Sequence, residues 1–117
     1  MSGQLLVNYK DAMIRVDNDK ELYDDLVNMF FDDPQFRPED LENLLAQGKN
    51  EEAAKLAHLL KGVAGTLGAD QLFAACKTLD DILRGRIEGD VPAAKDAVIL
   101  LFSETSKELK RYLEEGI

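Results

Sequence analysis

The stretch "AHLLKGVAGTLGA", residues 57–69, places the one histidine of the chain among three glycines in a segment with helical periodicity. Apolar residues recur at helical spacing over residues 50–67, which predicts a helix that ends at Gly68. At 3.6 residues per turn, these apolar residues share one face of roughly 120°, which we expect to pack on the core. The predicted core face consists of Ala53, Leu56, Ala57, Leu60, Val63, Ala64 and Leu67.

His58 falls on the other side of this predicted helix, about 160° from the centre of the apolar face. Gly62 and Gly65 follow it one and two turns along, on the same outward side. A glycine inside a helix costs about 1 kcal/mol relative to alanine, so two of them need a reason. We interpret them as positions where the absence of a side chain lets a partner molecule approach the helix closely. Close packing of another helix is the alternative, and for Gly62 the pattern leaves it open.

An outward imidazole at this place indicates nucleophilic chemistry, because a neutral imidazole is a good nucleophile near pH 7. Lys61 stands three residues further on, within side-chain reach. Its ammonium is suited to pair with the oxygens of a phosphoryl group on His58. Such a histidine also needs a partner for its second ring nitrogen, which fixes one tautomer.

The segments on either side of this helix are also predicted to be helical. Residues 8–16 predict a short helix, and a second helix follows with Asn18 as N-cap and Glu21 completing a capping box. Pro34 and Pro38 end or interrupt it, and Pro38 begins the next helix, which stops at Gly48. The apolar stripe expected on the helix after Asn18 is Leu22, Leu26, Met29 and Phe30.

The central helix is expected to begin at an Asn50 cap, and two further helices follow it at about residues 69–85 and 91–116. No segment has the pattern of a strand. The sequence therefore predicts an all-α fold, an antiparallel up-down four-helix bundle with an additional short N-terminal helix. The stripe expected on the helix after Gly68 is Leu72, Phe73, Cys76, Leu79 and Leu83.

The composition narrows the class of protein. The 117 residues fit one domain, 1–117 with a core of about 10–115, and 45% are hydrophobic. A net charge of −9 argues against nucleic acid and anionic lipid as partners. One cysteine allows no internal disulfide, and neither a signal peptide nor a membrane span is apparent, so we expect a cytoplasmic protein.

The stretch from Ala57 to Asp80 resembles the signature of the histidine phosphotransfer (HPt) domains of bacterial multistep phosphorelays. The resemblance extends from about residue 10 to residue 85. It is specific because the His-x-x-Lys-Gly motif occurs together with the downstream spacing. The matching positions are His58, Lys61, Gly62, Gly65, Gly68, Ala69, Cys76, Leu79 and Asp80.

The resemblance implies that His58 accepts a phosphoryl group from a receiver aspartyl phosphate and passes it to another receiver. It implies that Lys61 steadies the phosphoryl charge and that Gly62 and Gly65 leave a flat docking surface. Asp80 would hydrogen-bond the imidazole from the next helix. Asp is shorter than the Glu more usual there, which leaves open whether that contact is direct or through water.

No nucleotide-binding motif is present, which favours a phosphoryl carrier over an enzyme, with no cofactor of its own. The Mg²⁺ of the transfer reaction would belong to the receiver. We expect a monomer whose partners are response-regulator receivers, a hybrid histidine kinase, or both.

Three alternatives remain open. The first is the phosphoryl-accepting domain of a chemotaxis-type kinase, which shares the fold and the histidine motif. The second is a degenerate adaptor that binds receivers without transfer, and the intact His58 and Lys61 argue against it. A helical module that binds metal or haem through His58 is least favoured. The only histidine and the only cysteine, Cys76, are too far apart in sequence for a usual ligand pair.

Overall fold

The computed structural model describes residues 5–116, and all regular structure within them is helical. The all-α prediction is therefore confirmed. The helices are α1 (Tyr9–Arg15), α2 (Lys20–Asp32), α3 (Pro38–Ala46), α4 (Asn50–Leu67), α5 (Asp70–Leu83) and α6 (Val91–Glu115).

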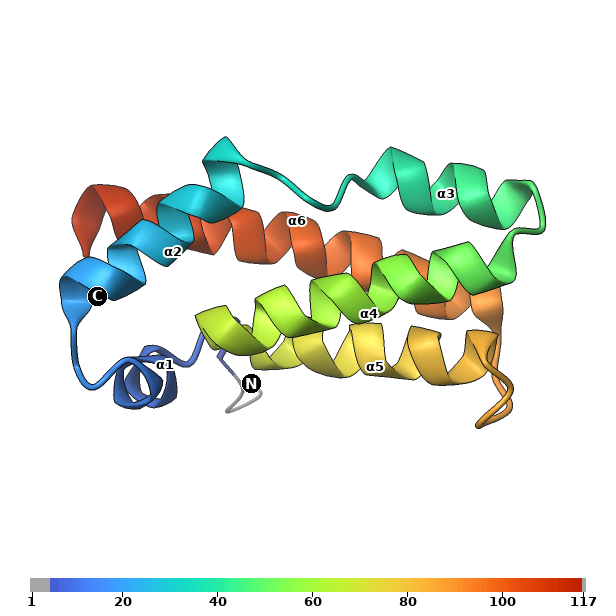
Figure 1. Ribbon diagram of the computed structural model, residues 1–117, viewed down its shortest axis with the longest axis horizontal. Coiled ribbons are helices and arrows are strands. Elements are labelled where there is room, and N and C mark those ends of the chain that lie inside the picture. The colour runs from blue at the N-terminus through green and yellow to red at the C-terminus, as the bar shows by residue number, and fades with distance from the viewer. Residues whose placement is uncertain (1–4, 117) are drawn as a thin grey trace.

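The long helices lie side by side, as Figure 1 shows. α4 and α5 run in opposite directions, and α6 extends along the length of the molecule and packs against α5. α2 and α3 follow one another along α4 and α6, on the side away from α5. The six helical segments expected from the sequence correspond to the six helices of residues 5–116, while the four-helix up-down arrangement stays a prediction. Pro34 and Pro38 separate α2 from α3, because proline lacks an N–H and disfavours helical geometry in the residue before it.

Two clusters of buried side chains form the core, and α4 contributes to both. The first joins α3, α4, α5 and α6, and the second joins α1, α2 and the ends of α4 and α6. Val63 packs against both clusters. The predicted core face of α4 is confirmed, with Leu56 and Val63 partly buried and the other five residues buried.

The predicted starts of two helices are wrong by one residue. The N-cap of α2 is Asp19, whose carboxylate accepts a hydrogen bond from the Leu22 N–H, whereas Asn18 lies in the left-handed region with a φ of 60°. A cap residue needs extended geometry, which Asp19 has and Asn18 lacks. Asn50 is the first residue of α4, and Lys49 precedes it without a side-chain cap.

The predicted stripe of α2 is partly wrong. Tyr23 and Val27 are buried, while Leu22 and Met29 are 44% and 57% exposed. The buried face includes Tyr23 because its hydroxyl donates a hydrogen bond to the Leu67 carbonyl at 2.7 Å. A tyrosine whose polar tip is satisfied can bury its ring like any other aromatic residue.

A cluster of three tyrosines, which the sequence did not predict, ties α1, α2 and α6 together. The ring of Tyr9 stacks on that of Tyr112 at 4.9 Å, and Tyr23 packs edge-on against both. The hydroxyl of Tyr112 donates to Asp24 at 2.5 Å, and that of Tyr9 donates to Glu108 at 2.6 Å.

We expect these two carboxylates to make the fold sensitive to acid. Hydrogen bonds from Lys20 and Tyr112 lower the pKa of Asp24. A lowered folded pKa means stability that is present above the ordinary carboxyl range and is lost as the pH falls through the folded value. Urea denaturation of the wild type and of Tyr112→Phe, from neutral pH to below about pH 4, should show a shallower loss in the variant. Equal losses would contradict the role of Tyr112.

Candidate functional site

His58 lies on the outward face of α4, opposite the core face, and its side chain is 62% exposed. The helical periodicity of residues 50–67 accounts for this position, because burial of the apolar stripe turns His58 toward solvent. The imidazole is therefore open to a partner molecule.

Asp80 approaches His58 from α5. Its Oδ2 atom lies 3.4 Å from the Nδ1 atom of His58, and its side chain is only 2% exposed. This separation leaves no room for a bridging water, so the interaction is direct. A carboxylate facing Nδ1 favours the tautomer with hydrogen on Nδ1, which leaves the lone pair of Nε2 free.

Two arginines that sequence reasoning missed surround the Asp80 carboxylate. Arg84 donates from Nε to Oδ1 of Asp80 at 2.5 Å, and a guanidinium nitrogen of Arg86 lies 3.8 Å from Oδ2. Arg86 lies nearer to Asp81, at 3.2 Å. The spacing of Asp80 and Arg84, four residues apart in a helix, is a signal that could have identified the first pair.

Lys61 and Gly65 meet α5 at Phe73. The Lys61 ammonium lies 5.8 Å from the centre of the Phe73 ring, within cation–π range. A side chain at Gly65 would begin 3.4 Å from the same ring. Phe73 is 37% exposed, so its prediction as a core residue is wrong: it lies at the edge of the α5 stripe and packs over Gly65.

These contacts fix how α4 and α5 are aligned. His58 and Gly65 are seven residues apart on α4, and Phe73 and Asp80 are seven apart on α5. Seven residues are about two turns, so each pair lies on one side of its helix. Packing of Phe73 over Gly65 therefore brings Asp80 opposite His58.

The surroundings of Gly62 distinguish the two interpretations of the glycines, which were room for a partner and close packing of another helix. A β-carbon built at Gly62 meets nothing within 4 Å, so no described residue packs against it. Helix packing therefore does not explain Gly62, although it contributes at Gly65.

We expect Gly62→Ala to raise the free energy of unfolding by about 0.5–1 kcal/mol, because alanine favours the helix and meets no neighbour. Chemical denaturation measures this. Gly65→Ala is the matched control and should gain less, because its methyl group contacts Phe73. A loss of stability in Gly62→Ala would contradict an open site.

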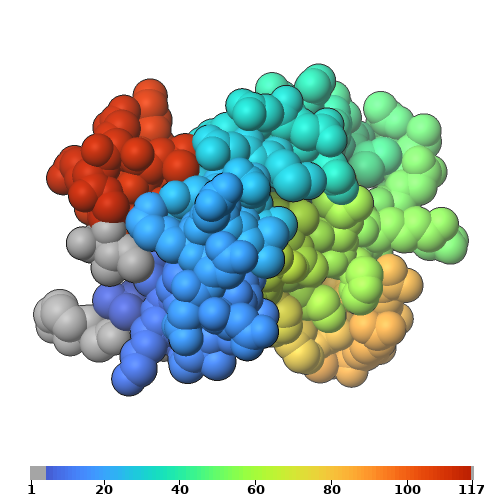
Figure 2. Space-filling model, turned by 60° about the vertical axis from the view of Figure 1, so that its left-hand side comes forward, coloured from blue at the N-terminus to red at the C-terminus, as the bar shows by residue number. Residues whose placement is uncertain are grey.

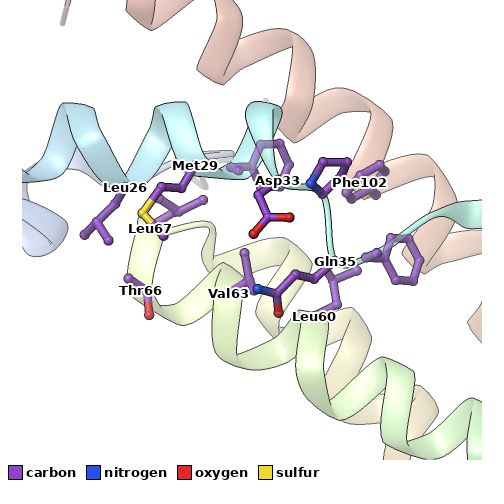
Figure 3. A pocket seen from close by; sticks show the side chains of 12 residues that line it. Leu26, Met29, Asp33, Gln35, Leu60, Val63, Thr66, Leu67 and Phe102 are labelled. Carbon is purple, nitrogen blue, oxygen red and sulfur yellow. The ribbon is translucent and has the colours of Figure 1, made fainter.

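A hollow of about 150 Å³ lies on the other side of α4, between α2, the segment that follows it and α6 (Figure 3). It is mainly apolar, with Asp33, Gln35 and Thr66 as polar residues. The Thr66 hydroxyl donates to the Gly62 carbonyl at 3.1 Å. The hollow contains neither His58 nor Asp80. Its lining is completed by Leu26, Met29, Phe30, Pro34, Phe36, Leu60, Val63, Leu67 and Phe102.

The surface around α4 carries exposed apolar side chains. Figure 2 shows α4 exposed between α2 and α5. Leu59 on α4, Met29 on α2 and Phe73 on α5 are all partly open to solvent. Such side chains beside an exposed imidazole favour docking of a protein partner.

The other candidate groups do not form a second reactive site. Burial raises the pKa of the Cys76 thiol to about 12, so it stays protonated at neutral pH. Among residues 5–116, no group of three or more His, Cys, Asp or Glu side chains could hold a metal ion. No helix in this part of the chain is long and apolar enough to cross a membrane.

The model of the Hpt domain family matches residues 25–115. The chain therefore belongs to the Hpt domain family, whose members are phosphocarriers in two-component signalling and interact with receiver domains and kinases. Comparison with curated proteins and with solved structures gives no match.

Proposed function

We propose that His58 accepts a phosphoryl group from the aspartyl phosphate of one receiver domain and passes it to the aspartate of another. The observation that supports this most directly is the exposed imidazole with its Nδ1 atom against the buried carboxylate of Asp80. That arrangement leaves Nε2 as the nitrogen available to a docked receiver.

In the forward step, the Nε2 lone pair attacks phosphorus and forms the N–P bond. The P–O bond to the receiver aspartate breaks, and its electron pair stays on the released carboxylate. The ring gains positive character during the step, which the Asp80 carboxylate stabilises. The second transfer reverses these bond changes with the carboxylate of another receiver as nucleophile, so that Nε2 regains its lone pair.

Lys61 is proposed to stabilise the phosphoryl oxygens. Its neighbours Lys55 and Lys77 pair with Glu51 and Asp81, whereas the ion pairs found within residues 5–116 include none for Lys61. The ammonium above Phe73 is therefore available to an incoming anion. We propose that the open backbone at Gly62 lets a receiver approach closely, and that Gly65 contributes by seating Phe73 beneath Lys61.

The transfer reaction also needs Mg²⁺ and partner proteins. We propose that the chain acts as a cytoplasmic monomer without a cofactor or ATP site of its own, and that Mg²⁺ is held by the receiver. The partners would be response-regulator receivers, a hybrid histidine kinase, or both. The net charge of −9 continues to disfavour nucleic acid.

The test is transfer from a panel of receivers phosphorylated with acetyl phosphate, followed on Phos-tag gels. Because the chain has one histidine, His58→Gln removes every histidine at once. Label on the wild type that is acid-labile and stable in base, absent from His58→Gln and passed to a second receiver supports the proposal. Binding without transfer would identify an adaptor. Labelling only by a kinase core with ATP would identify a chemotaxis-type phosphoryl acceptor.

A further inference from the structure

The Asp80 carboxylate divides its two oxygens between different partners. Oδ1 accepts from Arg84 Nε at 2.5 Å, and Oδ2 faces His58 Nδ1 at 3.4 Å. The Asp80 side chain is almost fully buried, while that of Arg84 is one-third exposed. A buried carboxylate is stable in its charged form only when it is paired and hydrogen-bonded.

We propose that Arg84 is a positioning residue that sets the tautomer of His58 through Asp80. By occupying Oδ1, the guanidinium fixes the rotation of the carboxyl group and turns Oδ2 toward the imidazole. An ionised carboxylate can only accept a hydrogen bond, so His58 must carry its hydrogen on Nδ1. Nε2 is then the bare nitrogen on the exposed side.

Loss of Arg84 would release the Asp80 carboxyl group. Without the guanidinium on Oδ1, no described hydrogen bond holds this group in the rotation that turns Oδ2 toward Nδ1. An imidazole whose Nδ1 atom faces no fixed acceptor can carry its hydrogen on Nε2 instead. This tautomer lacks a lone pair at Nε2, so the nucleophile is lost although His58 is still present.

The other charges near Asp80 supply a matched control. Arg86 lies 3.8 Å from Oδ2 but closer to Asp81, and its side chain is 58% exposed. Asp81 pairs with Lys77 as well, and its pKa is lowered mainly by its hydrogen bond from Lys77 and then by that from Arg86. On α4, Lys61 lies over Phe73. Arg84 is thus the only cation that hydrogen-bonds Asp80 among residues 5–116.

The experiment reads the tautomer directly from nitrogen NMR of ¹⁵N-labelled protein at about pH 8, where a histidine ring is ordinarily neutral. The single histidine gives one pair of ring nitrogens, so the spectrum needs no assignment between residues. The variants are Arg84→Met, which keeps an unbranched stem without charge, Arg84→Lys, which restores a cation, and Arg86→Met as control.

We expect hydrogen on Nδ1 in the wild type and in Arg86→Met, a shift toward hydrogen on Nε2 in Arg84→Met, and partial recovery in Arg84→Lys. An unchanged tautomer in Arg84→Met, in a sample whose helical circular dichroism matches the wild type, would overturn the proposal. A general loosening of the fold would not explain recovery by lysine at this one position.

The consequence for phosphoryl transfer rests on the proposed function and is tested separately. Arg84→Met should slow the labelling of His58 by about tenfold to a hundredfold, the effect seen when residues that orient metal-bound histidines are replaced. A tautomer change without any transfer to the wild-type chain would count against the proposed function and leave the role of Arg84 intact. Slower transfer with an unchanged tautomer would reject that role.

Discussion

Asp80→Asn is expected to slow phosphorylation of His58 by about a hundredfold or more while the helices stay folded. The amide oxygen would take the place of Oδ1 and accept from Arg84, which turns the NH₂ group toward His58. A donor facing Nδ1 selects the tautomer with hydrogen on Nε2. The same exchange in a serine protease triad lowers the rate about 10⁴-fold, and the exposure of His58 argues for a smaller effect here.

The neighbouring Asp81→Asn is the control for this prediction. Asp81 contacts Lys77 and Arg86 and has no contact with His58 among the described ion pairs. The rate of labelling by a phosphorylated receiver, measured over a time course, should change by less than about threefold, because Asp81 does not touch the imidazole. Similar rates in the two variants would show that Asp80 does not act through the imidazole.

Gly68→Ala is expected to lower the free energy of unfolding by about 2–4 kcal/mol, a large part of the stability of a small domain. Gly68 ends α4 with a φ of 80°, where an L-residue is disfavoured by about 1–2 kcal/mol. An alanine β-carbon would also lie 2.7 Å from the Asn8 carbonyl oxygen and 2.9 Å from the Ala12 β-carbon. The Asn8 N–H donates to the Gly68 carbonyl at 2.7 Å, so α1 cannot move aside without losing this bond.

Gly85→Ala separates the cost of the left-handed backbone from the cost of the steric clash. Gly85 has a similar φ of 75°, but a β-carbon there meets nothing within 4 Å. It should therefore lose only the conformational part, about 1 kcal/mol, in the same urea denaturation series. Equal losses at the two positions would show that contact with α1 contributes nothing.

The sequence predicts much of the fold, because the helices follow from apolar periodicity. The core face of α4 and the direction of His58 both follow from counting 100° per residue. The end of α4 at Gly68 follows from the preference of glycine for the left-handed region. These features depend on residues close together in the chain.

Predictions that depended on distant contacts were less successful. Tyr23 replaces Leu22 and Met29 on the buried side of α2 because the Leu67 carbonyl accepts its hydroxyl hydrogen. Phe73 has the spacing of a core residue, yet Gly65 provides its place at the surface. Neither partner can be identified from the local pattern.

In the candidate site, too, local features were predictable and distant contacts were not. The resemblance to HPt domains implied that Asp80 is a partner of His58. The direct approach at 3.4 Å is seen only once α4 and α5 are aligned in the structure. The ion pair between Arg84 and Asp80 could have been inferred from their spacing of four residues. The burial of the Asp80 carboxylate makes this pair important, and that burial depends on tertiary packing.

The two sides of α4 have a consequence for how such a protein could diversify. Its inward residues hold the core, whereas Leu59, Gly62 and Thr66 point outward and bear little of the packing. Substitutions that alter the choice of partner would thus fall on different positions from those that threaten folding. A lineage could exchange one signalling partner for another through this outward row while its scaffold stays the same.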